Sequence, residues 1–583
     1  MKARAVVAVL LLAVAAQVVL SMMQESATSD EVPHLAAGYT YLKTGDYRLN
    51  YEHPPLVKMI AALPLLALDL DLNLEHPSWE NRHEWSFGEG FINRNKVPAK
   101  TIIFWGRVPM LLLALMLGLL VYKWASEIYG VKAGLIALFL YAFCPNILGN
   151  APLVTLDVGN TLFMVFSGYT FYHFLRRPRA LSAVLAGCAL GLALSSKMTS
   201  LNLLPIYFIL TVIFLLKREV PGTSPRRLIL GGGLMIGLAA VVILLAYRVT
   251  SVHYYLDSVR YFVKDVGSGG RPAFLFGHYS TSGWYYYFLA AMLVKTPIPS
   301  LILIGVAVVL LARRRRVGFS EYCLLVPVVF FLSVASLSRL QLGLRYILQI
   351  YPFLFVFTGG MIAGLVFEKT SRRRFAPIVV GVLLLWYCAG TLRTFPHYLA
   401  YFNELVGGPK NGYKCLLDSN LDWGQDLPSL AKFLQEEGSP EVILSFFGTA
   451  WPKTYGITYQ DFYSYNLSSR REDHINSLTP SRELFVISAN SLQCLYYPDK
   501  TLYDWLKQRK PLAVVGYTLF VYDITNDADA QARLGAMYLN NTLFKRAERQ
   551  FRRVLAIDPG NAVAQQYLDY IAQLPTGQSP PAK

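Results

Sequence analysis

Charged residues are scarce in this sequence, and their scarcity excludes most soluble proteins. Only 16% of the 583 residues are Asp, Glu, Lys or Arg, whereas 54% are hydrophobic, and the mean hydropathy is +0.37. This composition is too apolar for a soluble multidomain chain. Apolar runs of about 20 residues, the length that a helix needs to cross a bilayer, recur up to the region of Trp386. We therefore expect a polytopic α-helical membrane protein, rather than one large globular core, followed by a soluble portion.

Cysteine is also rare, and its spacing does not suggest a metal site. Four of the six cysteines fall in predicted spans. The six are Cys144, Cys188, Cys323, Cys388, Cys415 and Cys494. Only Cys415 and Cys494 share the external portion, where a disulfide between them is possible. Redox chemistry is therefore not the expected function.

Acidic residues are fewer than basic ones, and the net charge is +17. The basic residues gather in short clusters between apolar runs. These clusters are Arg176, Arg177 and Arg179; Lys217, Arg218, Arg226 and Arg227; Arg313 to Arg316; and Lys369 with Arg372 to Arg374. Because Lys and Arg resist translocation, such clusters mark the cytoplasmic side of a membrane. The charge thus indicates topology and argues against nucleic-acid binding.

With every cluster on the cytoplasmic side, the chain fits about eleven spans. We expect them near residues 5–23, 101–123, 130–149, 154–175, 180–196, 201–217, 228–248, 284–312, 320–338, 344–367 and 375–394. The N-terminus is then cytoplasmic and the C-terminal portion external. Residues 1–23 are alternatively a cleaved signal peptide, but no clear small-x-small cleavage site precedes Asp30, so a retained span is favoured.

The first external region, residues 24–100, opens with SDEVPHLAAGYTYLKTGDYRLNYEHPPL at residues 29–56. Ser29 or Asp30 can cap a helix on which Asp30 and His34 share a face at i, i+4. A second, interfacial helix should begin at Pro54-Pro55. Its N-terminus, with Glu52, His53 and Lys58 nearby, suits an anionic head group.

Other charged residues are expected at the same external boundary. Asp157 enters an apolar run, and an acid at the edge of a span is a functional candidate because its burial costs several kcal/mol. Lys197 and Arg345 lie near the same side of their own runs. Carboxylates and cations converging at one lipid–water boundary indicate a site for a phosphate-bearing lipid and a nucleophile.

These motifs, in this order, resemble the GT-C glycosyltransferases, which include the protein O-mannosyltransferases and the aminoarabinose transferase of lipid A. The resemblance covers residues 1–395. It includes the Asp30-Glu31 pair, the Glu-His-Pro-Pro-Leu element, and the single acid Asp157. It also includes the run WYYYFLAAMLVKTPIPSLIL after residue 283 and the Gly343-Leu344-Arg345-Tyr346 element.

The resemblance implies an enzyme that takes a sugar from a polyprenyl phosphate on the non-cytoplasmic face and transfers it with inversion. Asp30 would be the general base, supported by Glu31, and Asp157 a second acid in the pocket. Glu52 and His53 would sit beside the donor. Lys58, Lys197 and Arg345 would hold the lipid phosphate, with Arg345 best suited because a guanidinium binds phosphate oxygens in pairs.

No cofactor is required by this chemistry, although some members of the family hold a metal. Glu52 with His253 or His278, which lie in the external loop 249–283, would then be the ligands. Interfacial histidines are more often hydrogen-bond partners than ligands.

The portion after the spans divides into two parts. Residues 396–526 contain DSNLDWGQDL and apolar runs such as EVILSFFG, which predict a periplasmic α/β domain. The acids of DSNLDWGQDL and Trp423 either touch carbohydrate or fix a loop to the membrane domain, the second being favoured. Residues 527–574 carry the order of a tetratricopeptide repeat, which we expect to pack on the α/β domain or bind a partner protein. Residues 575–583 are expected to be disordered.

Together these observations predict a hexosyl- or pentosyltransferase in a bacterial inner membrane that acts on the periplasmic side. The acceptor is a protein, a glycan or another lipid. The alternatives are a lipid-linked sugar flippase or transporter, which would place charges near the bilayer midplane, and an assembly scaffold, which would leave Asp30, Glu52 and Asp157 without a role.

Overall fold

The computed structural model describes residues 2–219, 224–268, 270–367, 375–464 and 482–574. The chain divides into two compact units, Met1–Gln425 and Asp426–Lys583. The predicted basic cluster Lys369 with Arg372 to Arg374 and the predicted disordered tail 575–583 lie outside the described residues.

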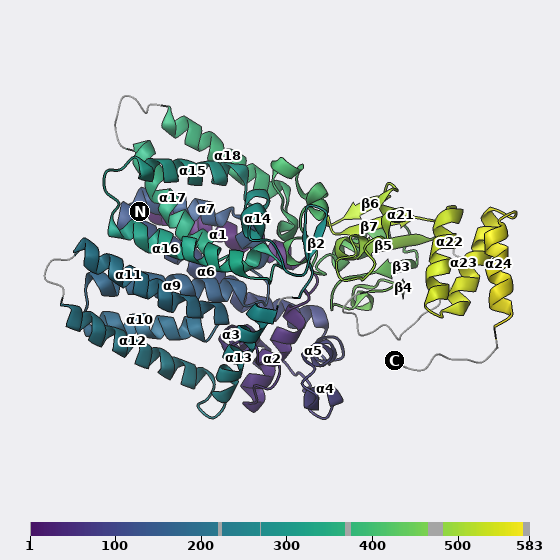
Figure 1. Ribbon diagram of the computed structural model, residues 1–583, viewed down its shortest axis with the longest axis horizontal. Coiled ribbons are helices and arrows are strands. Elements are labelled where there is room, and N and C mark those ends of the chain that lie inside the picture. The colour runs from purple at the N-terminus through teal and green to yellow at the C-terminus, as the bar shows by residue number, and fades with distance from the viewer. Residues whose placement is uncertain (1, 220–223, 269, 368–374, 465–481, 575–583) are drawn as a thin grey trace. The chain divides into compact units, whose positions relative to one another are not determined.

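The first unit is helical apart from one short hairpin (Figure 1). Its helices are α1 Lys2–Met22, α2 Glu31–Thr44, α3 Leu56–Ala62, α4 Pro77–Glu80, α5 Glu84–Asn93, α6 Ala99–Tyr129, α7 Val131–Ala142, α8 Pro145–Asn150, α9 Asp157–Arg176, α10 Ala180–Leu194, α11 Leu203–Lys217, α12 Pro225–Ala246, α13 His253–Ser268, α14 Tyr287–Lys295, α15 Ile298–Ala312, α16 Phe319–Leu337, α17 Ile350–Phe367 and α18 Ala376–Arg393. The hairpin pairs β1 Ala273–Leu275 with β2 His278–Ser280 in antiparallel register.

Among the described residues, seven helices are long and apolar enough to cross a membrane, or eight if a bent pair counts as one span. The predicted polytopic helical membrane fold is confirmed. Every predicted span contains a helix, but the figure of eleven spans stays a prediction.

Three of the predicted spans have a different form from the one expected. The run 284–312 is not one helix, because α14 and α15 meet at 117°, where Pro297 cannot continue α14. The run 130–149 is interrupted before Pro145, and in the run 344–367 the helix begins at Ile350, after the 3₁₀ turn η3 Leu344–Ile347.

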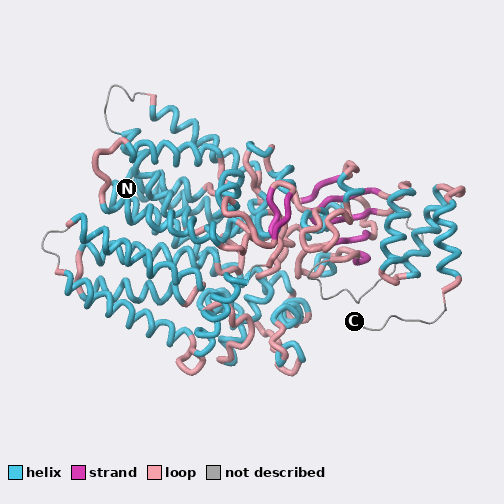
Figure 2. The backbone as a smooth tube through the Cα atoms, viewed as in Figure 1, coloured by secondary structure: helices cyan, strands magenta, loops and turns pink. Residues whose placement is uncertain are grey.

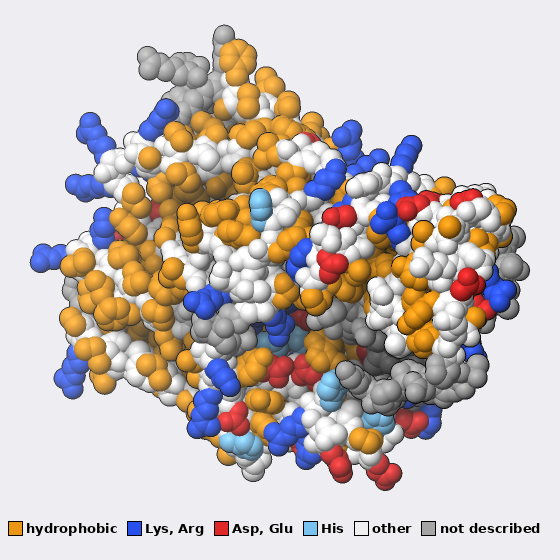
Figure 3. Space-filling view, turned by 45° about the vertical axis from the view of Figure 1, so that its right-hand side comes forward, with side chains coloured by type: hydrophobic (Ala, Val, Ile, Leu, Met, Phe, Trp, Pro, Cys, Tyr) orange, Lys and Arg blue, Asp and Glu red, His pale blue; other side chains and the backbone are white. Residues whose placement is uncertain are grey.

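The outer helices carry the apolar surface that a bilayer requires. Leu230 and Ile236 of α12 and Ile378 and Leu385 of α18 are 63–73% exposed. On the face shown in Figure 3, hydrophobic side chains cover the helical part, and Lys and Arg side chains project at its left-hand end. This distribution suits helices whose sides face lipid and whose ends face water.

Residues 24–98 fold as a small layer of helices around α2. A Cβ at Gly38 would overlap the Lys58 carbonyl oxygen, so only glycine allows α2 to meet α3 this closely. On another side of α2, a Cβ at Gly88 of α5 would lie 2.8 Å from the Val32 carbonyl oxygen. The predicted second helix, α3, begins directly after Pro55. These close packings fix the residues at the start of α2.

The second unit contains a five-stranded sheet and helices (Figure 2). The strands are β3 Val442–Ser445, β4 Tyr459–Asp461, β5 Leu484–Ser488, β6 Ala513–Val515 and β7 Leu519–Asp523, in the order β4-β3-β5-β7-β6. β3 runs parallel to β4 and β5, and β7 runs antiparallel to β5 and β6. The predicted sheet-containing domain is therefore present.

The boundary between the units differs from the predicted boundary at residue 396. Residues 396–425 pack with the first unit, because Lys295 donates hydrogen bonds to the carbonyls of Leu399 and Asn420. Cys415 and Cys494 consequently fall in different units, and all six cysteines are unpaired.

Six helices complete the second unit: α19 Leu427–Glu436, α20 Ala489–Leu492, α21 Asp504–Lys507, α22 Ala528–Asn540, α23 Phe544–Ile557 and α24 Ala562–Ala572. The helical tail joins the sheet through the buried carboxylate of Glu483. Gln531 donates to it at 2.7 Å, and Arg553 lies 2.9 Å from it. The tail therefore packs on the α/β domain, whereas its assignment as a tetratricopeptide repeat stays a prediction.

Candidate functional site

A cleft in the first unit collects most of the predicted site residues. It encloses about 150 Å³ and is lined from α2, the turn at residues 50–53, α5, the start of α9, α13 and η3. Of the predicted residues, it is lined by Asp30, Glu52, His53, Asp157, Lys197 and Arg345. Glu31, Lys58, His253 and His278 do not line it.

One side of the cleft is a network of two carboxylates and two cations. Arg345 Nη1 lies 2.9 Å from Asp30 Oδ2 and 3.4 Å from Asp157 Oδ2. Lys197 Nζ lies 2.6 Å from Asp157 Oδ1. The side chain of Asp157 is 1% exposed and that of Arg345 9%, so the surroundings screen these charges weakly.

Asp30 does not cap α2 as the sequence suggested. It occupies the N-cap position, but its side chain makes no capping hydrogen bond, and its carboxylate turns to Arg345 instead. The attraction of a nearby guanidinium exceeds that of one backbone N–H group. The carboxylate is thereby held toward the cleft.

Arg345 is fixed by residues of the DSNLDWG element. Its Nε donates to Ser419 Oγ at 3.1 Å, and its guanidinium carbon lies 4.2 Å from the centre of the Trp423 ring. The backbone N–H of Ser29 donates to the Trp423 carbonyl at 3.0 Å. The element thus contacts both Ser29, which precedes Asp30 in the chain, and the Arg345 guanidinium, which pairs with Asp30. Asp426, which follows two residues after DSNLDWG in the predicted DSNLDWGQDL element, lies in the second unit, where it accepts a hydrogen bond from Thr518.

Glu31 is buried below the cleft rather than in it. Arg107 Nε and Nη2 donate to its two oxygens at 2.9 and 2.6 Å, and the backbone N–H groups of Thr28 and Val154 donate at 2.8 and 2.9 Å. Burial raises the pKa of Glu31, but the charge of Arg107 and these hydrogen bonds outweigh it and hold the pKa below the ordinary value. Glu31 therefore anchors the start of α2.

Lys58 is also placed away from the cleft. Its ammonium donates to Tyr41 and to the carbonyls of Asn50 and His53 at 2.7–3.0 Å. Burial lowers its pKa to about 7. These contacts fix the turn that carries Glu52 and His53, and they leave Lys58 no approach to a ligand in the cleft.

The other side of the cleft is rich in hydrogen-bond acceptors. Asn50 Nδ2 donates to both Glu52 and Glu84 at 3.0 Å. Burial and the charge of Glu52 raise the pKa of Glu84 to about 8. Sequence reasoning did not identify Glu84, because HEW at residues 83–85 forms no recognisable motif.

Further cleft residues that the sequence did not single out come from α13 and its neighbourhood. Tyr261, Phe262 and Arg271 line the cleft. The aromatic richness of this loop was a weak signal, since aromatic residues also gather at membrane interfaces for physical reasons.

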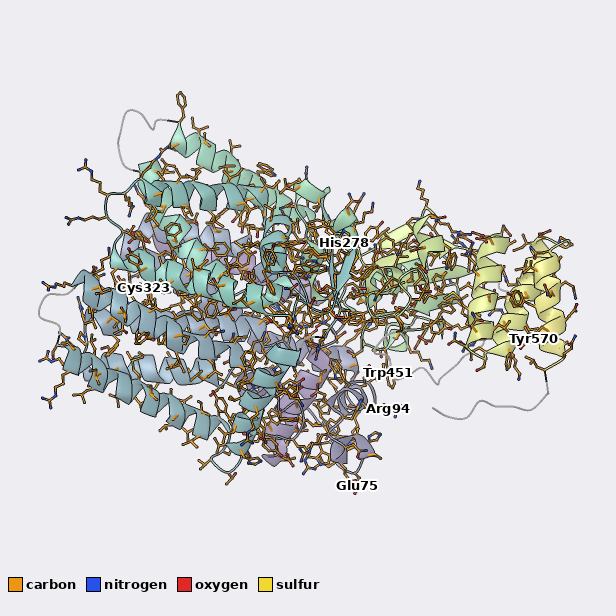
Figure 4. All side chains as sticks on the ribbon, viewed as in Figure 1. Glu75, Arg94, His278, Cys323, Trp451 and Tyr570 are labelled. Carbon is orange, nitrogen blue, oxygen red and sulfur yellow. The ribbon has the colours of Figure 1, made fainter. Side chains whose placement is uncertain are left out.

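The predicted metal set is not assembled as a cluster. His278 lies on the β1–β2 hairpin (Figure 4), and the ring of His253 packs on Tyr254, with the ring centres 4.2 Å apart. Within the described ranges, no group of three or more His, Cys, Asp or Glu side chains is placed to hold a metal ion.

Comparisons with known proteins agree with the sequence-based family. Residues 101–247 match the family model for dolichyl-phosphate-mannose-protein mannosyltransferase. A search of curated proteins found no match. The segment 101–247 runs from the first turn of α6 to the end of α12 and carries Arg107, Asp157 and Lys197.

Among solved structures, the chain is similar to ArnT from Cupriavidus metallidurans bound to undecaprenyl phosphate, with 14% identity and a TM-score of 0.46, over 88% of this chain and 97% of that one. It is similar to the Archaeoglobus fulgidus oligosaccharyltransferase, with 12% identity and a TM-score of 0.46, over 67% and 56% of the two chains. It is also similar to the arabinosyltransferase EmbB from Mycobacterium smegmatis, with 12% identity and a TM-score of 0.37, over 67% of this chain and 37% of that one. The family-model match confirms, over residues 101–247, the resemblance to the protein mannosyltransferases of the GT-C glycosyltransferases.

Proposed function

We propose that this protein transfers a sugar from a polyprenyl phosphate to an acceptor hydroxyl, with inversion, on the periplasmic face of a bacterial inner membrane. The observation that carries the proposal is the meeting of Asp30, Asp157, Lys197 and Arg345 in one cleft. A carboxylate that can take a proton therefore lies beside cations that can bind a phosphate. The matched family model is described by a lipid-phosphate sugar, which supports the class of donor.

The chemistry needs few protein groups. The acceptor oxygen attacks the anomeric carbon from the side opposite the phosphate, its proton passes to Asp30, and the bond from carbon to phosphate oxygen breaks. The products are the glycosylated acceptor and the lipid phosphate. Because phosphate is a good leaving group, a strong general acid is unnecessary, and one positioned base suffices.

Lys197 and Arg345 stabilise the charge that develops on the phosphate. The N–H groups of both residues donate to carboxylates. In the donor complex, the phosphate oxygens replace those carboxylates as the acceptors. Such preorganised donors act strongly in a site with little water. Before the donor binds, Asp157 contacts both cations and keeps them directed into the cleft.

The acceptor is a protein, a glycan or a lipid. The helical tail α22 to α24 offers a second surface for a protein partner outside the cleft. It contributes no residue to the proposed chemistry.

The test is donor turnover by the purified protein in detergent, with a panel of polyprenyl-phosphate sugars. The wild type is compared with Asp30→Asn, which keeps the size of the side chain but removes the base. We expect turnover of at least one donor by the wild type and a loss of about 10²-fold or more in kcat with the variant, the usual range of a general base.

Asp69→Asn is the matched control, because the Asp69 side chain is 89% exposed and lies outside the cleft. Its turnover should equal that of the wild type. Undiminished turnover by Asp30→Asn would transfer the role of base to Asp157, and the absence of turnover of every donor by the wild type would refute the proposal.

A further inference from the structure

The cleft is lined by two separate groups of charged side chains, one held around Arg345 and the other around Asn50. Lys197, Arg345 and Arg271 are the cations that line it, whereas Glu52 and Glu84 line it together with Asn50. A lipid phosphate is repelled by the charge of Glu52 and attracted by the cations. A donor whose phosphate binds these cations would place its sugar against the remaining lining of the cleft, which includes Glu52, Glu84 and two histidines.

His34 lines the same cleft, one turn of α2 after Asp30. Its Nδ1 lies 3.1 Å from the carbonyl oxygen of Val154. A carbonyl only accepts hydrogen bonds, so Nδ1 carries the proton and Nε2 carries a lone pair. Burial lowers the pKa of His34 to about 4, which keeps the ring neutral at neutral pH.

The Nε2 atom of His34 is available to a ligand. The residue is 4% exposed and lines the cleft. Within the part of the chain that the structure describes, the contact to Val154 is the one hydrogen bond of this ring. A buried ring whose lone pair has no protein partner is costly unless a ligand or water supplies a donor.

His53 places a second neutral imidazole beside the first. The ring centres are 5.8 Å apart and the planes nearly perpendicular. Burial, together with His34 and the nearby cations, holds the pKa of His53 well below the ordinary value. Its ring nitrogens make no hydrogen bond within the described ranges, so the pair offers both a donor and lone pairs to the cleft.

We propose that His34 and His53 form the sugar subsite, in which His34 Nε2 accepts a hydrogen bond from a hydroxyl of an uncharged sugar on the lipid donor. The inference rests on the proposed function and adds the substrate class. A sugar carboxylate would meet Glu52 and a lone pair on His34, both of which repel it. Hydroxyl groups, which donate and accept, match this lining.

Two substitutions separate the binding role of His34 from its structural role. The amide nitrogen of Asn occupies the place of Nδ1, so His34→Asn keeps the donor to Val154 and removes the acceptor at Nε2. His34→Gln instead presents amide oxygen near the Nε2 position. The matched control is His76→Gln, because His76 is an exposed histidine of the same external region that does not line the cleft.

The assay compares polyprenyl-phosphate mannose with its monodeoxy forms. For the wild type, one deoxy donor should lose about tenfold in kcat/KM, the upper range for one neutral hydrogen bond. His34→Asn should lose about tenfold with mannose and show no further loss with that deoxy donor. His34→Gln should recover most of the activity, and His76→Gln should match the wild type.

Equal turnover by His34→Asn and the wild type would overturn the inference. It would also be overturned if the deoxy donor lowered kcat/KM by the same factor in His34→Asn as in the wild type, because the two losses would then be independent. Preferred turnover of a uronic acid donor would overturn the substrate class. If the wild type transfers none of the panel, the proposed function fails, and the sugar subsite is then decided by binding of the donor.

Binding provides a second measurement that does not depend on turnover. His34→Asn should bind undecaprenyl phosphate as tightly as the wild type and undecaprenyl-phosphate mannose about tenfold more weakly. Equal weakening of both ligands would assign His34 to the structure of the cleft and overturn the sugar subsite.

Discussion

The Glu31–Arg107 pair gives the sharpest test of how the site is held, and the perturbation is Glu31→Gln. Both side chains have 0% exposure. The two Glu31 oxygens accept from Arg107, Val154 and Thr28, which together direct five N–H or O–H groups at them. A Gln side chain has one oxygen, so its NH₂ group must face donors, and the Arg107 charge loses its partner.

The expected cost follows from that unpaired charge. Removing one partner of a buried ion pair destabilises a protein by about 3–5 kcal/mol. With an entropy of unfolding of about 2.1 cal/mol/K per residue, a unit of this size melts about 1 °C lower per kcal/mol. We therefore expect the melting temperature of Glu31→Gln to fall by about 3–5 °C.

Thermal unfolding can be followed with a thiol-reactive dye, because Cys144 and Cys323 are buried and unpaired in the helical unit. The double variant Glu31→Gln with Arg107→Met should cost less than the sum of the single variants, since it leaves no uncompensated charge. Additive losses, or a single-variant melting temperature within about 1 °C of the wild type, would refute the reasoning.

The pH dependence has a definite sign. The pKa of Glu31 is lower in the folded state than its ordinary value of 4.5, so the carboxylate's contribution to stability is complete above pH 4.5 and is lost as the pH falls through the folded-state pKa. The difference in melting temperature between wild type and Glu31→Gln should be constant at pH 6–8 and shrink below pH 4.5.

Well below the melting temperature, Glu31→Gln should retain turnover within about tenfold, because Glu31 does not touch the cleft. Complete loss of turnover in Glu31→Gln with the fold intact would show that Glu31 takes part in the reaction.

Two further predictions concern Arg345. Arg345→Lys keeps the charge but loses the Nε contact to Ser419 and paired binding of phosphate oxygens, so kcat/KM for the lipid donor should fall about 10²-fold, measured by steady-state kinetics; a fall below threefold would show that charge alone is required. Trp423→Leu removes the aromatic face under the guanidinium, worth about 0.5–2 kcal/mol, and should raise the KM for the donor about 3- to 10-fold with little change in kcat. The control Trp105→Leu, at a 42% exposed position in α6, should change neither kcat nor KM. An unchanged KM in Trp423→Leu would show that Trp423 does not position Arg345.

Much of the fold followed from composition and local pattern. Apolar runs predicted the helices of the first unit because a bilayer leaves no other way to satisfy the backbone of a spanning segment. The helix after Pro54-Pro55 was predicted from proline's fixed backbone angle. Alternating apolar runs predicted the strands of the second unit.

The placement of Asp30, Asp157, Lys197 and Arg345 near one boundary also followed from the sequence, because charged residues avoid the apolar interior and collect where spans end. Which of them make contact was decided by packing between segments that lie 40 to 315 positions apart in the sequence. Arg345 reaches Asp30 across 315 positions of sequence. No local pattern encodes that distance.

The sequence by itself determined that this is a membrane protein with acids and cations at one surface. Only the tertiary structure decided that Glu31 pairs with Arg107 below the cleft, that Lys58 is held by the turn at residues 50–53, and that Glu84 joins Glu52. The physical reason is that hydropathy fixes how deep a segment lies, while the direction of each side chain depends on which buried partner satisfies its charge.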